Sequence, residues 1–365
     1  ELQRNFFASL EIPNLGRYEY KLHATFCVIN KEIKLRNNTI DLFKLIASFS
    51  VITVHVGLYA DISQTFGEIA RLSGRWAVPF FFLVTGAFLA INKREKKCNK
   101  QAIKILSIFL VSSLLFLPYV FLKDSEYLNT ISVRRILTSG TYFHLWFLSS
   151  LAAGLVSFQL INNFIPRMIL PFSIFFILIY AVVDVLAYTP EPGMIEKVHG
   201  LSRYANSFSF ISLGYLIVDK SFLKNTPVNV KEILIVIIFF GLFFLEPFIT
   251  YKFTGSEVMQ RQFPIFTPII AVIIMILCFR VNTKRNLFSE AGEKYSLGIY
   301  LVHPLFLPIF NKLFAYMNVS NTILIVIMTF FSSWMFVVFL KIKIPFAFNL
   351  LYGSVRVQRK KLITS

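Results

Sequence analysis

Apolar runs of about twenty residues recur along this chain, separated by short gaps that hold most of the charged residues. A helical run of this length crosses a bilayer, whereas the strands of a membrane barrel alternate over about ten residues. The pattern therefore predicts an all-α, polytopic integral membrane protein with about ten transmembrane helices. We expect the spans at residues 39–58, 75–92, 102–122, 142–161, 168–188, 203–218, 232–250, 263–279, 295–311 and 321–340.

Composition supports this class and a single membrane domain. The 365 residues are 56% hydrophobic and only 15% charged, which is too apolar for a soluble protein of this length. No repeat, low-complexity tract or long polar insertion interrupts the spans, so we place one transmembrane domain at residues 36–345. Residues 1–35 lack the features of a signal peptide and are expected to form a cytoplasmic segment of uncertain order, and residues 346–365 a basic cytoplasmic tail.

The positive charge of the chain follows the spans. A net charge of +18 would suit a nucleic-acid partner in a soluble protein. Here Lys and Arg concentrate in alternate gaps, as the positive-inside rule describes, so we expect membrane lipids around the chain and no nucleic acid. This asymmetry predicts that both termini are cytoplasmic. It leaves fewer basic residues on the outer side, chiefly Arg71, Arg75, Lys123, Arg134, Arg135, Lys197, Arg203, Lys252, Arg261 and Lys312.

The first span carries a stripe of polar residues. Asp41, Lys44, Ser48 and His55 fall within a sector of about 60° on a helix, with about three turns between Lys44 and His55. Ionisable side chains at membrane depth usually face a bundle interior or a wet cavity. The alternative is that Asp41 and Lys44 mark the inner interface while His55 reaches the outer headgroups, and this span alone does not separate the two.

Two further histidines occur where lipid contact would be unfavourable. His144 opens the fourth span in FHLWFL, and His303 lies inside the ninth span on one helical face with Ser296 and Tyr300. A single histidine of this kind is more often a packing residue than a catalyst, but three spans with imidazoles favour a shared polar cavity. No closely spaced ligand pair or H-E-x-x-H motif accompanies them, so we expect no metal.

Other intramembrane groups are weaker candidates. Asp184, Glu246 and Arg280 are charges within or beside spans, and the Glu246-Pro247 pair predicts a kink or the outer end of its span. No paired or metal-type spacing links the three cysteines, so we assign no chemistry to Cys27, Cys98 and Cys278.

Four segments together resemble the integral-membrane acyltransferase-3 family of bacterial O-acyltransferases. They are Asp41 with Lys44 and, after ten residues, His55; RWAVPFFFLVTGAFL at 75–89; HLWFL at 144–148; and YSLGIYLVHPL at 295–305. The chain resembles single-domain members of the family, but the segment of about 35 residues before its first span is longer than such members usually have. Many relatives have Arg where Lys44 stands, so a bidentate contact is not implied there.

The resemblance implies a reaction. Family members are thought to move an acyl group, usually acetyl, from cytoplasmic acetyl-CoA to a sugar hydroxyl outside the bacterial inner membrane. By this resemblance His55 would be the general base or a transient acyl carrier. Lys44 would orient the donor and Asp41 would hold Lys44, while Arg75 would bind the acceptor or stabilise the oxyanion.

The resemblance also implies binding roles. Lys100 and Lys104 are similar to the paired basic residues before the third helix of the family and would bind the polyanionic coenzyme A, unless they are ordinary positive-inside charges. The other polar residues of the matching segments would contact substrate, namely His144, Trp146, Ser296, Tyr300 and His303.

Two other functions stay open. A bundle with buried polar residues suits a non-enzymatic transporter or flippase of a glycan or a small amino acid, although no inverted repeat supports it. A glycosyltransferase using a polyprenyl-linked sugar would need loop carboxylates such as Glu191, Glu196 and Glu257. For an acyltransferase, the sequence does not distinguish O-antigen, capsule, common antigen or another acceptor, acetyl from another short acyl group, or one oligomeric state from another.

Overall fold

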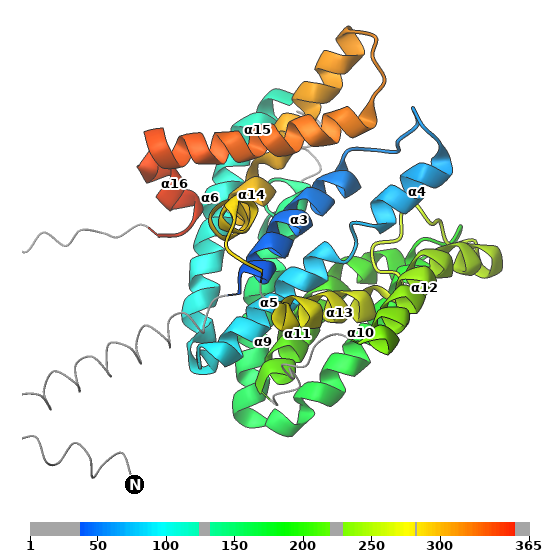
Figure 1. The fold of residues 1–365 in the computed structure, drawn as a ribbon, viewed down its shortest axis with the longest axis vertical. Coiled ribbons are helices and arrows are strands. Elements are labelled where there is room, and N and C mark those ends of the chain that lie inside the picture. Colours follow the sequence, from blue (N-terminus) through cyan, green and yellow to red (C-terminus); the bar gives the residue numbers. More distant parts are fainter. Residues whose placement is uncertain (1–36, 124–131, 220–228, 282, 355–365) are drawn as a thin grey trace, which may run out of the picture. The chain divides into compact units, whose positions relative to one another are not determined.

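The computed structural model describes residues 37–123, 132–219, 229–281 and 283–354, and in this part of the chain the regular elements are helices (Figure 1). The predicted N-terminal segment and the basic end of the predicted tail lie outside the described residues. The helices are α3 (Asn38–His55), α4 (Gln64–Leu72), α5 (Ala77–Ile91), α6 (Cys98–Lys123), α8 (Val133–Ser139), α9 (Trp146–Phe164), α10 (Ile169–Ala187), α11 (Ile195–Asp219), α12 (Val230–Thr254), α13 (Thr267–Arg280), α14 (Leu287–Tyr316), α15 (Thr322–Lys343) and α16 (Pro345–Leu351).

The predicted spans all fall on helices. Three of the helices that carry predicted spans lack either the length or the apolarity of a membrane crossing. They are α13, which has only 14 residues, and α3 and α11, which carry polar side chains. The all-helical, multi-pass membrane class is confirmed, while the count of about ten crossings and the cytoplasmic termini stay predictions. Seven helical stretches in the described residues meet both criteria: Gln64–Ile91, Glu95–Leu122, Phe143–Phe164, Pro166–Ala187, Val230–Thr254, Leu287–Tyr316 and Thr322–Lys343.

Local signals explain where the longer helices begin and end. α12 starts at a capping box formed by Asn229 and Glu232, which satisfies backbone N–H groups that a helix start leaves open. It ends at Gly255, whose left-handed backbone (φ 72°) costs a glycine little. α12 continues past Pro247 to Thr254, so the Glu246-Pro247 pair does not end the helix.

Glycines allow the central helices to approach closely. A Cβ added to Gly292 of α14 would lie 1.7 Å from the carbonyl oxygen of Asp41 in α3, and one added to Gly86 of α5 would lie 1.8 Å from that of Ile211 in α11. Without a hydrophobic force between helices in lipid, such close packing is the main source of association. The Ser48 hydroxyl also donates to the carbonyl oxygen of Ser296 at 3.1 Å, so the polar stripe of α3 faces α14.

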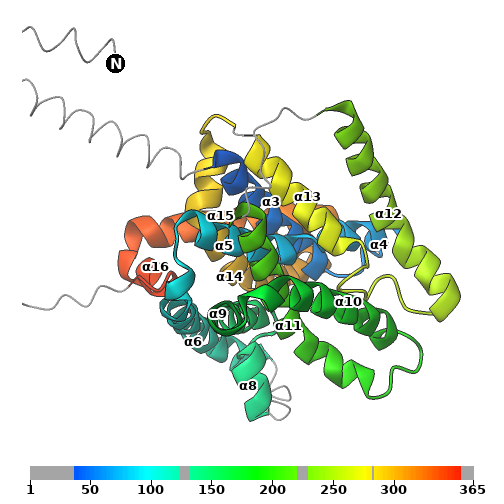
Figure 2. The same cartoon turned by 90° about the horizontal axis from the view of Figure 1, so that it is seen from below.

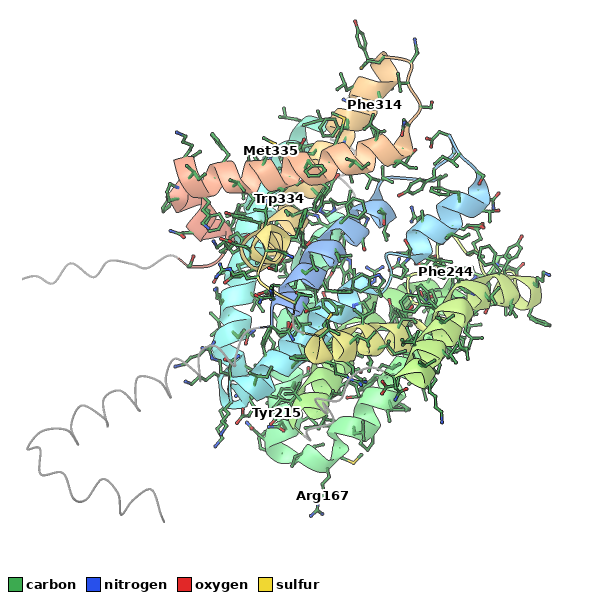
Figure 3. All side chains as sticks on the ribbon, in the orientation of Figure 1. Arg167, Tyr215, Phe244, Phe314, Trp334 and Met335 are labelled. Atoms are coloured by element: carbon green, nitrogen blue, oxygen red, sulfur yellow. The ribbon has the colours of Figure 1, made fainter. Side chains whose placement is uncertain are left out.

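The central and peripheral helices differ in their surroundings. Figures 1 and 2 place α3, α5 and α14 among the other helices, with α12 at the periphery. Apolar side chains cover the peripheral surface, and Met335 of α15 projects from it with 72% of its area exposed (Figure 3). Arg167, in the turn between α9 and α10, projects from one end of the bundle (Figure 3). Arg167 belongs to the gap that the charge pattern assigns to the cytoplasmic side.

Candidate functional site

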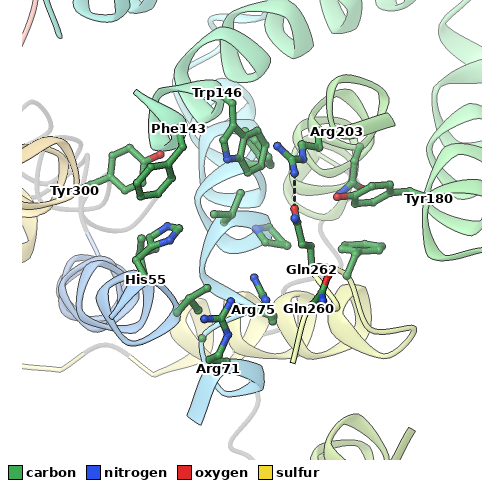
Figure 4. Close-up of a pocket in the computed structure, with 18 residues that line it drawn as sticks. His55, Arg71, Arg75, Phe143, Trp146, Tyr180, Arg203, Gln260, Gln262 and Tyr300 are labelled. Atoms are coloured by element: carbon green, nitrogen blue, oxygen red, sulfur yellow. Dashed lines mark hydrogen bonds between the residues drawn. The ribbon is translucent and has the colours of Figure 1, made fainter. Parts of the chain in front are cut away.

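A cavity of about 350 Å³ lies at the end of the bundle where α3 finishes (Figure 4). Side chains from α3, α4, α5, α9, α10, α11 and α14, and from the loop between α12 and α13, line this cavity. Successive spans cross the membrane in opposite directions, so the helix ends around the cavity lie on the side that the charge pattern predicts to be outer. Of the residues expected to act in catalysis or binding, His55, Arg75, Trp146 and Tyr300 line the cavity.

His55 is the last residue of α3, and its ring lines the cavity beside Phe143 and Tyr300 (Figure 4). The imidazole stacks on the ring of His303 at a centroid distance of 5.7 Å and meets the ring of Phe143 at 4.9 Å. Among the described residues it makes no hydrogen bond, so both ring nitrogens are available to a ligand. This arrangement suits a group that exchanges a proton with a substrate.

His144 and His303 form the wall behind His55. His303 is fully buried, and its Nδ1 donates to the carbonyl oxygen of Tyr300 at 2.7 Å, while His144 Nε2 donates to that of Leu301 at 3.2 Å. Because a carbonyl oxygen only accepts, these bonds place the protons on His303 Nδ1 and His144 Nε2. The opposite nitrogens, His303 Nε2 and His144 Nδ1, find no partner in the described structure. The three imidazoles predicted to share a polar cavity lie in ring contact through His303, but of the three it is His55 that lines the cavity.

Three arginines line the cavity, with Arg71 and Arg75 next to one another and Arg203 beside Trp146, and we call Arg71, Arg75 and Arg203 the arginine wall (Figure 4). Arg203 donates to the side-chain oxygen of Gln262 at 2.7 Å, and its guanidinium lies 4.8 Å from the centre of the Trp146 ring. From the sequence we expected a role in the reaction only for Arg75. The signals for the other two were present, because Arg71 and Arg75 are four residues apart and Arg203 falls within a predicted apolar span.

A buried ion network holds the loop that supplies Gln262. Arg261 is fully buried and donates through Nε to Asp184 at 2.7 Å and through Nη2 to Glu246 at 3.3 Å. Asp184 also accepts from the backbone N–H of Gln262 at 3.0 Å and pairs with His199 at 3.0 Å. Asp184 and Glu246, noted as weak candidates in the sequence, thus position a cavity loop without lining the cavity.

The expected donor-side residues lie away from the cavity. Lys44 Nζ donates to Asp41 at 2.8 Å and lies 5.1 Å from the centre of the Phe88 ring. Val51 is the first residue of α3 that lines the cavity. The N-terminal part of the polar stripe on α3 is packed against Gly292 and Ser296 of α14 instead. Asp41, Lys44 and Ser296 therefore do not line this cavity, and their roles in binding or catalysis stay predictions.

The remaining candidates also lie outside the cavity lining. Lys100 and Lys104 are exposed on the first turns of α6, and Arg280 forms a bidentate pair with Glu232 at 2.9 and 3.1 Å. Cys98 and Cys278 are buried, and Cys27 lies outside the described residues. In residues 37–354, leaving aside the undescribed gaps, no group of three or more His, Cys, Asp or Glu side chains is arranged to hold a metal ion.

Comparisons with known proteins agree with this architecture. The chain is 25% identical to an amino-acid racemase of Enterococcus faecalis over 324 residues, which cover 82% of this chain and 45% of that protein. It is 24% identical to a serine/alanine racemase of Enterococcus gallinarum over 296 residues, covering 74% of this chain and 41% of that one. The chain thus spans less than half the length of these relatives. No solved structure shows significant similarity. The family model described as an acyltransferase domain matches residues 37–338, and the chain therefore belongs to the acyltransferase-3 family of membrane acyltransferases.

Proposed function

We propose that this protein transfers an acetyl group from acetyl-CoA to a hydroxyl of a cell-surface or lipid-linked glycan, with His55 as the general base. The observation that carries the proposal is the position of the His55 ring, which borders the cavity without a hydrogen bond to the described residues and faces the arginine wall. Family membership supplies acyl transfer as the reaction class. The acceptor hydroxyl requires a base because it is a poor nucleophile at neutral pH.

The proposed reaction has two proton transfers and one exchange of bonds. A neutral His55 takes the proton as the acceptor oxygen attacks the thioester carbonyl, and a new C–O bond forms. The resulting oxyanion is stabilised by a guanidinium of the arginine wall, for which Arg75 is our candidate. The C–S bond then breaks, and the leaving thiolate of coenzyme A receives the proton from His55.

Acetyl transfer by the purified protein tests this proposal. The wild-type protein in lipid nanodiscs would be incubated with ¹⁴C-acetyl-CoA and membrane glycan isolated from the source bacterium. We expect label in the glycan that mild alkali releases, since an O-ester hydrolyses under those conditions. If the label stays in acetyl-CoA with every membrane glycan tested, the result would contradict the proposal.

The donor side has its own test in Lys100 and Lys104. Replacing both with Gln should raise the KM for acetyl-CoA by about three- to tenfold with little change in kcat, because exposed charges contribute modest attraction to a polyanion. Lys312→Gln is a matched control, because Lys312 is an exposed lysine near the C-terminal end of α14, on the side that the charge pattern predicts to be outer. An unchanged KM in the double variant would leave Lys100 and Lys104 as charges that only set topology.

The names of the relatives favour one second candidate, a binding or transport site for a small amino acid. Two are described as racemases of amino acids, and a guanidinium in a cavity of this size suits an α-carboxylate. Among the described residues, the cavity lining holds no lysine or cysteine, and we put this candidate forward as a binding function. Saturable uptake of L-serine into proteoliposomes without acetyl transfer would favour it. The glycosyltransferase alternative loses ground because Glu191, Glu196 and Glu257 do not line the cavity.

A further inference from the structure

The arginine wall carries more positive charge than the surrounding protein neutralises. Among the residues that the structure describes, no carboxylate lies within ion-pair distance of Arg71, Arg75 or Arg203. Asp184 and Glu246, the carboxylates of the neighbouring ion network, are already paired with Arg261. Each of the three arginines also has a buried Nε without a hydrogen-bond partner in the described structure.

Such a cluster is costly unless an anion completes it. Charges withdrawn from water are destabilising until they are paired, and this penalty grows inside a membrane protein. Guanidinium groups present several donors in a plane that matches a carboxylate or a phosphate. The three side chains come from α4, the α4–α5 turn and α11, so they converge on one cavity from separate elements.

The rest of the cavity suits a saccharide. Asn206, Gln260 and Gln262 bring side-chain amides to the lining, and Asn206 Oδ1 has no partner in the described structure. The amide nitrogens of Gln260 and Gln262 already donate to Glu257 and Tyr188, and each keeps a second N–H for a ligand. The indole of Trp146 offers a flat apolar face of the kind that packs against a sugar ring. Arg203 and Trp146 also line a smaller adjoining cavity of about 110 Å³. A sugar in the larger cavity would therefore lie between His55 and Arg203.

We propose that the acceptor is an anionic saccharide, whose carboxylate or phosphate binds the arginine wall while its hydroxyl faces His55. This inference rests on the acyl-transfer function proposed above and specifies the chemical class of its acceptor. The arginine wall selects the charged sugar, and the amide side chains orient the hydroxyl that is acetylated. A neutral sugar leaves the three guanidinium groups unpaired and binds more weakly for that reason.

Matched sugars test the requirement for charge. Calorimetric titration of the purified protein would compare p-nitrophenyl β-glucuronide and glucose 1-phosphate with the neutral p-nitrophenyl β-glucoside. We expect the wild type to bind at least one charged probe about tenfold or more tightly than the glucoside, as hydrogen bonds to charged groups imply. Comparison of the glucuronide with glucose 1-phosphate shows whether the site prefers a carboxylate or a phosphate. Equal affinity for all three probes would overturn the proposal.

Arg203 variants assign the preference to the arginine wall. Arg203→Gln should remove most of the preference, and Arg203→Lys should retain part of it because the charge remains. Arg285→Gln is the matched control, since Arg285 is half exposed and lies 3.7 and 3.8 Å from Glu290 and Glu293. A preference that persists unchanged in Arg203→Gln would contradict the assignment.

Two further measurements separate this proposal from the others. If the charged probes compete with coenzyme A, or if Arg203→Gln raises the KM for acetyl-CoA, the arginine wall binds the donor and the proposal fails. Binding of L-serine with no binding of either charged sugar would also overturn it. Acetylation of membrane glycan by a protein that shows no charge preference would reject the anionic acceptor alone, whereas charge preference without any acetyl transfer would reject the acyl-transfer function.

Discussion

A His55→Gln variant should transfer acetyl groups about 10²- to 10⁴-fold more slowly than the wild type, the range expected when a general base is lost. Glutamine keeps a polar side chain of similar length, but it cannot take the proton of the acceptor hydroxyl. Because His55 makes no hydrogen bond with the described residues, its replacement leaves no buried partner unsatisfied, and we expect normal membrane levels. The measurement is kcat for glycan acetylation at saturating donor and acceptor.

His144→Gln is the matched control for this prediction. His144 is equally an imidazole of the cluster, but it is 1% exposed and lies behind the cavity lining. Its replacement should reduce kcat far less than His55→Gln, since Gln can still donate to the carbonyl oxygen of Leu301. Equal losses in both variants would show that the cluster acts through packing, and a wild-type rate in His55→Gln would remove His55 from the mechanism.

The His55→Gln variant also distinguishes the two roles proposed for His55, a general base and a transient acyl carrier. If His55 is a base, rapid mixing of the wild type with ¹⁴C-acetyl-CoA and no acceptor should leave the protein unlabelled. Label on the protein that is lost in His55→Gln would identify an acetyl-imidazole and favour the carrier.

The fold was largely predictable because lipid restricts the possibilities to helices that satisfy their own backbone. Every expected span corresponds to a helix, with errors of eight residues at the starts of α11 and α14 and of five or fewer at the other ends. Hydropathy could not show that α13 is only 14 residues long, since the point at which a helix ends depends on its packing against neighbouring helices. The close contact between Gly292 and Asp41 is an example of such packing that periodicity does not reveal.

The candidate site was predictable only where its residues lie in recognisable segments. His55, Arg75 and Tyr300 belong to the segments that resemble the family, and they line the cavity. Arg203 and Gln262 were missed because helix packing joins them across 59 residues of sequence. Hydrophobic patterns record which face of a helix is buried, but they do not record which distant loop completes a cavity.

The buried ion network should have the largest effect on stability. An Arg261→Met variant leaves Glu246 without its cation and Asp184 with only His199 as an ion-pair partner among the described residues, and breaking a buried pair in this way costs about 3–5 kcal/mol. The free energy of unfolding in mixed micelles would measure the loss. Arg280→Met is the matched control, because its partner Glu232 is 36% exposed and such pairs contribute about 1 kcal/mol or less. Similar losses in both variants would show that the Arg261 network has no special role.

Neutralising the whole network separates its electrostatic role from its positioning role. In a triple variant with Arg261→Met, Asp184→Asn and Glu246→Gln, no buried charge is left unpaired, so much of the lost stability should return. The guanidinium that joins the loop to α10 and α12 is still missing, and Gln262 then loses part of the support that holds it beside Arg203. We therefore expect a stable protein whose KM for the glycan acceptor stays raised while its KM for acetyl-CoA is unchanged. Recovery of both stability and acceptor KM would mean that the network only balances charge, because the loop would then hold its place without Arg261.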